Sequence, residues 1–335
     1  MVTIAGNVGM MALVHTFSSL HTPMYYFLSS LSMVDISYSS VITPNMLSHF
    51  LSSKKSISKS ISFLDCAVQL YLFCALGCTE AILLSSMSYD RYVAICHPLH
   101  YALIMTKKKC FGLVLYSSSI SFFQSVVQTS CVFSLPFCGS NLIDHFCCDI
   151  LPLISLSSSH SLHCEMVSGV LIAIFGTYTL TTIFLSYVFI FLLIFRMTTT
   201  QSRQKAFSTC SSHIICVSTY ITAVFFTYLR PYSGRFNIQD KVASVLYTAV
   251  TPMLNPLIYS LRNQEVKRLL VQTLHLAQCS QESTVLQATT KPRHVHQIAR
   301  QRSLIGHCGE HISIALESSG SVLYATAYDA FHCTW

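Results

Sequence analysis

Seven apolar segments alternate with polar connections along this chain, and this pattern limits it to one kind of fold. The 335 residues are 52% hydrophobic and only 10% charged, whereas a soluble domain usually carries about 25% charged residues. A segment of roughly 20 apolar residues is long enough to cross a membrane as a helix. The sequence therefore predicts an all-α membrane protein, built as a bundle of seven transmembrane helices.

The first expected span is short. Its 17 residues reach about 25 Å as a helix, and the hydrocarbon core is about 30 Å thick. We expect a truncated first helix without a cleavable signal peptide, and poor delivery to the cell surface, which a complete outer half helix with a glycosylated leader should improve. The expected spans are residues 1–17, 24–51, 61–93, 107–131, 165–196 and 205–229, with the seventh around 252–259.

Basic residues gather at the ends of the spans, which suits anionic lipid headgroups better than nucleic acid. Cytoplasmic loops carry the excess of Lys and Arg, so the richer side predicts the cytosol. The expected protein is a multi-pass protein of the plasma membrane with its N-terminus outside and its C-terminus in the cytosol. Ten basic residues fall on the inner side: Arg91, Lys107, Lys108, Lys109, Arg196, Arg203, Lys205, Arg262, Lys267 and Arg268. Six fall on the outer side: Lys54, Lys55, Lys59, Arg230, Arg235 and Lys241.

An acid–base pair, Asp90-Arg91, closes the long apolar run of the third span. Such a pair is costly at the bilayer centre, so it must lie where the helix meets water. Pro98 then ends the helix, because it lacks an amide proton and restricts the residue before it. By itself the pair fits either a plain juxtamembrane charge cluster or a functional site.

Three polar side chains lie at membrane depth: Asn7, Asp35 and Glu80. Asn7 is expected to hydrogen-bond to a neighbouring helix beside Asp35. The two carboxylates repel each other when both are ionised, so either one is protonated or a cation lies between them. A neutral hydrogen-bonded pair and a cation site are equally open.

Four stretches carry specific motifs. Residues 20–25 read Leu-His-Thr-Pro-Met-Tyr, and residues 87–96 read Met-Ser-Tyr-Asp-Arg-Tyr-Val-Ala-Ile-Cys. Residues 205–213 read Lys-Ala-Phe-Ser-Thr-Cys-Ser-Ser-His, and residues 252–259 read Pro-Met-Leu-Asn-Pro-Leu-Ile-Tyr. From residue 4 to about 270 the chain thus resembles the vertebrate olfactory (odorant) receptors, a family of rhodopsin-like G-protein-coupled receptors.

The resemblance implies an odorant receptor and not an enzyme. Its partners would be a small hydrophobic or volatile odorant, membrane lipid, and a heterotrimeric G protein of the stimulatory olfactory type, with no nucleic acid. Residues 260–263 and 265–270 read as a short amphipathic helix on the inner surface after the seventh span. The resemblance implies a polar network of Asn7, Asp35, Glu80 and Asn255, with a possible sodium ion near Asp35 and Glu80. The residues implied for G-protein coupling and switching are Asp90, Arg91, Tyr92, Tyr187, Lys205, Ser208, His213, Ile221, Asn255, Pro256 and Tyr259. In the resting state Arg91 is expected to pair with Asp90.

Two features depart from the family pattern. The triplet Phe-Tyr-Gly of the sixth helix reads Tyr-Ile-Thr over residues 220–222, so Ile221 replaces the switch tyrosine. The residues after 271 do not resemble the family, and we expect a receptor domain over 1–271 and a disordered or foreign tail over 272–335. A non-signalling receptor remnant or truncated gene model is the main alternative, and a channel or transporter is a weaker one.

Most of the fifteen cysteines lie in apolar runs and are read as small hydrophobic residues. The loop over 132–164 resembles the family's second extracellular loop, which implies a Cys66–Cys148 disulfide. Cys138 is then free or pairs with Cys147 or Cys164. A zinc site of His145, Cys147, Cys148 and His163 is a sharper alternative, although the spacing is not a standard zinc pattern.

The odorant pocket is expected one or more turns outward of the motifs, on the third, sixth and seventh helices. Tyr228 and Thr248 would give the few polar contacts that orient an apolar ligand, while ordinary helix packing is the alternative for each position. The expected lining is Phe73, Cys74, Gly77, Cys78, Val224, Phe225, Tyr228, Val245 and Thr248. No metal ligands are expected in it.

Overall fold

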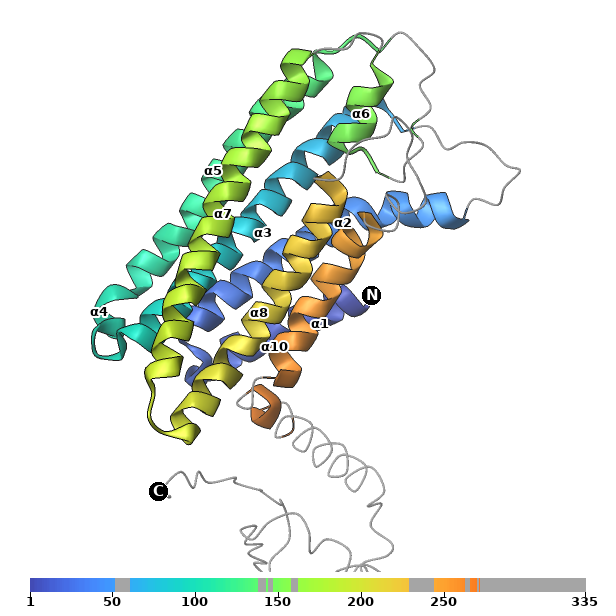
Figure 1. The fold of residues 1–335 in the computed structure, drawn as a ribbon. Coiled ribbons are helices and arrows are strands. Elements are labelled where there is room, and N and C mark those ends of the chain that lie inside the picture. Colours follow the sequence, from blue (N-terminus) through green and yellow to red (C-terminus); the bar gives the residue numbers. More distant parts are fainter. Residues whose placement is uncertain are drawn as a thin grey trace, which may run out of the picture. The chain divides into compact units, whose positions relative to one another are not determined.

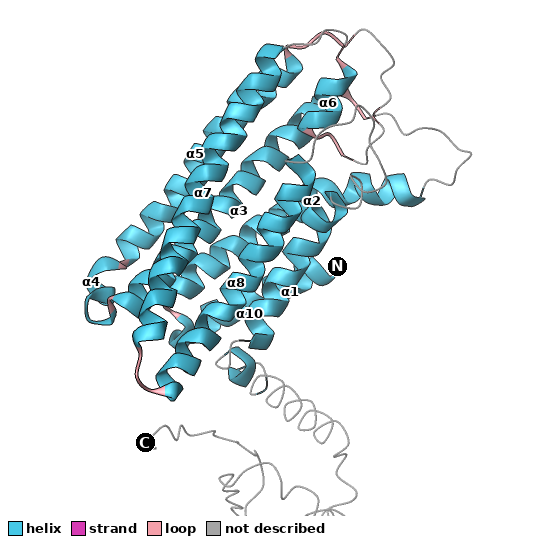
Figure 2. Cartoon of the chain, in the orientation of Figure 1, coloured by secondary structure: helices cyan, strands magenta, loops and turns pink. Residues whose placement is uncertain are grey.

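A computed structural model describes residues 1–51, 61–137, 143, 147–157, 162–228, 244–262, 266–269 and 271, and within these ranges it contains helices and no strand. A helix stands at each of the seven expected spans, as Figures 1 and 2 show. In chain order they are α1 (Val2–Thr16), α2 (Pro23–Leu51), α3 (Phe63–Cys96), α5 (Lys107–Phe133), α7 (Leu162–Arg196), α8 (Thr200–Tyr228) and the π-helical turn η3 (Leu246–Val250), which runs directly into α10 (Thr251–Arg262).

The ends of several helices follow from local chemistry. The Ser62 hydroxyl accepts a hydrogen bond from the Asp65 amide at the start of α3, and Thr106 accepts one from the Lys109 amide at the start of α5. Such caps satisfy amides that have no partner inside the helix. Helix α3 ends at Cys96, and Pro98 opens the short 3-10 helix η2 (Pro98–His100), which the four-residue helix α4 (Tyr101–Ile104) follows. The predicted break at Pro98 is therefore confirmed.

Helix α3 is the central element of the bundle. It packs against α2, α5, α7 and α8, whereas α10 packs against α1, α2 and α8 (Figure 1). Helices α3, α5, α7 and α8 are each long and apolar enough to cross a membrane by length and composition, and α1 is a shorter apolar helix. Many serine and threonine hydroxyls of α5 and α7 donate hydrogen bonds to backbone carbonyls one turn earlier, as Ser117 does to Leu113. These bonds leave fewer unpaired donors in the apolar phase.

One helix was not expected from the sequence, and the structure agrees with the expectation at another. The long loop after α5 contains a helix, α6 (Ile150–Leu156), which begins where the Asp149 carboxylate accepts from the amide of Ile150. Beyond α10, residues 266–269 are helical, with Val266 and Leu269 buried and the two basic residues between them exposed. That pattern agrees with the expected amphipathic helix.

Residues 1–269 form the first compact unit of the chain. The expected tail over 272–335 lies outside the described residues, so the domain boundary at 271 stays a prediction. Small helices and loops aside, the described part of the first unit is a single helical bundle, and the candidate sites lie between its helices.

Candidate functional site

The inner end of α3 places Asp90 differently from the sequence expectation. Its buried carboxylate accepts a hydrogen bond from the Tyr101 hydroxyl, with 2.8 Å between the oxygens. No ion pair joins Asp90 to Arg91 among the described residues, because neighbouring residues on a helix point in different directions. Burial and the nearby carboxylate raise the pKa of Tyr101, so its hydroxyl stays protonated and keeps donating. Tyr101 was not a predicted site residue.

Arg91 is left with an unsatisfied group. Its Nε is buried and has no hydrogen-bond partner in the described part of the chain. A buried donor without a partner costs about 1–3 kcal/mol, and more when it is charged. The inner end of α3 thus carries a cation whose buried Nε has no hydrogen-bond partner among the described residues.

Tyr187 and His213, two predicted switch residues, meet in the inner half of the bundle. The Tyr187 hydroxyl lies 2.6 Å from Nδ1 of His213, and Nε2 of His213 lies 3.1 Å from the carbonyl oxygen of Leu84. A carbonyl only accepts, so Nε2 carries the proton and Nδ1 accepts from the tyrosine. The fully buried His213 therefore joins α8 to both α3 and α7. Leu84 contributes only its backbone and gives no sequence signal.

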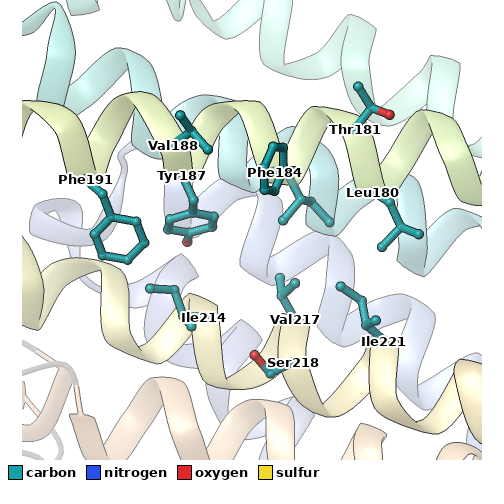
Figure 3. Close-up of a pocket in the computed structure, with 11 residues that line it drawn as sticks. Leu180, Thr181, Phe184, Tyr187, Val188, Phe191, Ile214, Val217, Ser218 and Ile221 are labelled. Atoms are coloured by element: carbon teal, nitrogen blue, oxygen red, sulfur yellow. The ribbon is translucent and has the colours of Figure 1, made fainter.

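The other predicted switch residues lie around this junction. Tyr92 packs beside Tyr187 against a small apolar cluster, and its hydroxyl is 3.1 Å from Nε2 of His97. Tyr259 is buried on α10, Pro256 lies within α10, and Ser208 is exposed on α8. The side chain of Lys205 lies outside the described residues. Ile221 lines a cleft between α7 and α8 (Figure 3).

The polar network at mid-bundle is centred on Asn255. Its amide nitrogen lies 3.0 Å from Oδ2 of Asp35 and 3.4 Å from Oε1 of Glu80, so one side chain on α10 donates to both buried carboxylates. The remaining oxygens, Asp35 Oδ1 and Glu80 Oε2, are buried and have no hydrogen-bond partner among the described residues. The structure thus brings together three of the four residues of the expected network.

Asn7 does not join this network directly. Its amide nitrogen donates to the carbonyl oxygens of Thr3 and Pro252, each at 3.0 Å. The carbonyl of Pro252 is free to accept this bond because proline at position 256 has no amide proton to donate to it. Gly6 packs next to this contact, where a side chain would meet the ring of Pro256.

Several predicted pocket residues converge in the outer half of the bundle. We call this group the outer cluster; it consists of the buried Tyr38, Ile42, Phe73, Leu76, Cys147 and Ala223, with the half-buried Cys74, Tyr220, Val224 and Val245 among the residues packed on it. The rings of Tyr38 and Phe73 stack with centroids 5.5 Å apart. Phe73, Cys74, Val224 and Val245 were expected here. Tyr38 lies one turn from Asp35 on α2, a spacing that could have revealed it, whereas Cys147 reaches the cluster from the loop.

The remaining predicted pocket residues are less well placed. Tyr220 donates to the carbonyl of Gly77 at 3.0 Å, and Thr248 is buried and donates to Ser244. Cys78 is half-buried on α3. Phe225 is 53% exposed, so the structure does not bring it to the outer cluster. The side chain of Tyr228 lies outside the described residues.

The cysteines of the loop correct one expectation and confirm another. Cys66 and Cys148 form a disulfide with Cα atoms 5.6 Å apart, as the resemblance implied. Cys164 pairs with Cys131 of α5, with Cα atoms 5.7 Å apart, so it is not the partner of Cys138, which lies outside the described residues. The zinc alternative is wrong as written, because Cys148 has no thiolate to offer a metal, and no group of three metal-binding side chains occurs in the described ranges.

These features define a rhodopsin-like receptor fold. The chain superposes on squid rhodopsin with a TM-score of 0.62 at 18% identity, covering 81% of this chain and 76% of that one. The sequence model of the olfactory receptor family matches residues 1–277. Mouse olfactory receptor 5G25 is 48% identical over 278 residues, which are 83% of this chain and 86% of that protein. Human olfactory receptor 5B12 is 45% identical over 280 residues, 84% of this chain and 88% of that protein. The chain belongs to the olfactory receptor family, whose members are multi-pass signalling receptors and not enzymes.

Proposed function

We propose that this olfactory receptor binds a small, hydrophobic or volatile odorant at the outer cluster and activates a stimulatory olfactory G protein. The observation that carries the proposal is that apolar side chains from distant parts of the chain meet in the outer cluster. Residues from α2, α3, α8 and the loop meet in one apolar group, with few hydroxyl groups among them. Such a composition suits an apolar ligand that a few polar contacts orient.

The signal would pass from the outer cluster to the inner end through α8. Tyr220 and Val224 touch the outer cluster, while His213, two turns further in, holds α8 to α3 and α7. An odorant that shifts the outer half of α8 would weaken the Tyr187–His213 contact. Outward movement of α8 would then open the inner face, where the unused donor of Arg91 can meet the G protein.

A sodium ion between Asp35 and Glu80 is part of the same proposal. The two unpartnered carboxylate oxygens are hard donors of the kind that alkali and alkaline-earth cations prefer. A cation there would offset the repulsion between two buried carboxylates. Asn255 would hold both carboxylates in place from α10. A shared proton would serve the same purpose, and titration of receptor stability with sodium distinguishes the two.

The proposed topology places the protein in the plasma membrane, with its N-terminus outside the cell and its C-terminus in the cytosol. It rests on the excess of basic residues on the inner loops. The Cys66–Cys148 disulfide lies at the end of α3 opposite to Arg91, and an oxidising extracellular side supports such a bond.

The test is a cAMP assay in cells that carry the stimulatory olfactory G protein, with an odorant panel and with surface staining to normalise expression. Phe73→Ala should weaken the response to any active odorant, while Phe123→Ala, which removes a 68% exposed ring of α5, should leave it unchanged. Arg91→Ala should abolish the cAMP rise at equal surface level. An unchanged response in Phe73→Ala would refute the pocket, and one in Arg91→Ala would refute the coupling site.

A further inference from the structure

An apolar cleft opens between α7 and α8, away from the outer cluster. It has a volume of ≈ 610 Å³. Figure 3 shows Leu180, Phe184 and Tyr187 of α7 facing Val217, Ser218 and Ile221 of α8 across it. The size falls within the usual range of about 300–1,000 Å³ for ligand pockets. The proposed odorant mechanism makes no use of this space.

The cleft is continuous with the surface that faces lipid. Phe184, which lines it, is 66% exposed, and the same outward side of α7 carries Phe195 at 70%. In a multi-pass membrane protein, large apolar side chains that are exposed on a long apolar helix contact acyl chains. The occupant therefore reaches the cleft from the bilayer, and it must be apolar over most of its length.

Two arginines stand at the inner end of the same two helices. Arg196 is the last residue of α7 and is exposed. Arg203, also exposed, lies in the first turn of α8 and folds back so that its Nη2 donates to the carbonyl oxygen of Met197 at 3.1 Å. This contact holds the second guanidinium beside the end of α7, and its other donors have no partner among the described residues. A phosphate group is the natural partner of such a pair.

The distances connect the two features. Arg196 follows Phe191 by five residues and Tyr187 by nine, which is about 8 Å and 14 Å along a helix. One leaflet of the hydrocarbon core is about 15 Å thick. A chain whose headgroup rests on the arginines thus reaches the cleft at Phe191 and ends near Tyr187.

We propose that the α7–α8 cleft binds one acyl chain of an anionic phospholipid from the cytoplasmic leaflet, with its phosphate held by Arg196 and Arg203. The bound chain lies against Tyr187, whose hydroxyl contacts His213 on the other helix. A bound lipid therefore affects the distance between α7 and α8, and it does so independently of the odorant. If the site fails its test, the proposed odorant function is unaffected.

The test uses the full chain in phosphatidylcholine vesicles that contain a trace of photoactivatable lipid. The reactive group sits in the half of one acyl chain that is farther from the headgroup. Phosphatidylserine and phosphatidylcholine probes with the same chains are compared, and the adducts are mapped by mass spectrometry. The phosphatidylserine probe should label Phe191, Ile214 and Ser218 in preference to Phe123, a lipid-facing residue of α5 that lies outside the cleft.

Two pairs of variants separate specific binding from ordinary lipid contact. Ser218→Phe fills the cleft and should remove the preferred labelling, whereas Ile215→Phe places the same ring at an exposed position of α8 outside the lining and should not. Arg196→Gln and Arg203→Gln should each weaken the preference for phosphatidylserine about fivefold, the factor that about 1 kcal/mol per basic residue corresponds to. Lys107→Gln, an exposed charge at the start of α5, should have no such effect.

Each outcome decides the matter. Equal labelling of the cleft and of Phe123 would mean an ordinary lipid surface and would overturn the proposal. Equal labelling by the two headgroups would overturn the role of the arginines. Preferential labelling by a photoactivatable sterol, competing with the phospholipid, would overturn the assignment of an acyl chain. Monodisperse elution and an intact Cys66–Cys148 bond confirm that each variant is folded.

Discussion

The contact between α1 and α10 gives a sharp test of how the receptor packs. Gly6 and Gly9 both lie in α1, three residues apart. A Cβ atom at Gly6 would lie 3.1 Å from Cγ of Pro256, whereas a Cβ at Gly9 would meet nothing within 4 Å. The preferred separation of two carbon atoms is about 3.5–4.0 Å. Gly6→Ala therefore forces α1 or the proline ring to move by several tenths of an ångström, and Gly9→Ala forces no movement.

The magnitudes follow from two opposing effects. Replacing glycine by alanine in a helix interior favours the helix by about 1 kcal/mol, and this gain is the same at both positions. Forcing an extra carbon into a packed interface typically costs about 1–3 kcal/mol. The free energy of unfolding of Gly6→Ala should thus lie about 1–3 kcal/mol below that of Gly9→Ala. In a domain of this size each kcal/mol shifts the melting temperature by roughly 2–4 °C.

The assay is thermal unfolding of the detergent-solubilised receptor, followed with a dye that fluoresces on reaction with thiols. Buried cysteines such as Cys110, Cys210 and Cys216 become reactive only when the bundle opens. Gly9→Ala should melt at or above the parent, and Gly6→Ala roughly 2–12 °C below Gly9→Ala. A Gly6→Ala receptor that melts as high as Gly9→Ala would show that the α1–α10 contact is looser than the structure has it.

Three further outcomes are expected. Tyr187→Phe removes a hydrogen bond between α7 and α8 that is worth about 0.5–1.5 kcal/mol, and it should raise ligand-independent cAMP roughly two- to tenfold. Tyr178→Phe, at an exposed position of α7, should leave it unchanged. Equal basal activity of the two variants would contradict the switch. Peptide mapping without reduction should recover Cys66 linked to Cys148 and Cys131 linked to Cys164, and any exchange of partners would contradict this pairing. Asn255→Leu leaves two buried carboxylates without their shared donor and should lower the melting temperature in a sodium-dependent way; a melting curve like that of the parent would argue against the network.

The sequence alone was enough for the seven-helix bundle and for the break that ends α3. Apolar length, the acid–base pair at 90–91 and the break at Pro98 act locally, through backbone hydrogen bonding and the cost of charge in hydrocarbon. The motifs add the identity of the family and the residues of the inner junction. The resemblance also put Asp35, Glu80 and Asn255 in one polar network, and the structure has Asn255 donating to both carboxylates.

Tertiary structure decided which side of each helix faces a neighbour. Phe225 and Val224 are adjacent in the sequence, yet Val224 joins the outer cluster and Phe225 points away from it. A rotation of α8 by a fraction of a turn would exchange them, and packing against α3, α7, η3 and α10 sets that angle. The same holds for Tyr101 at Asp90 and for Cys131 at Cys164, which meet across chain segments. Such contacts depend on how whole helices dock, and local sequence carries no direct signal for them.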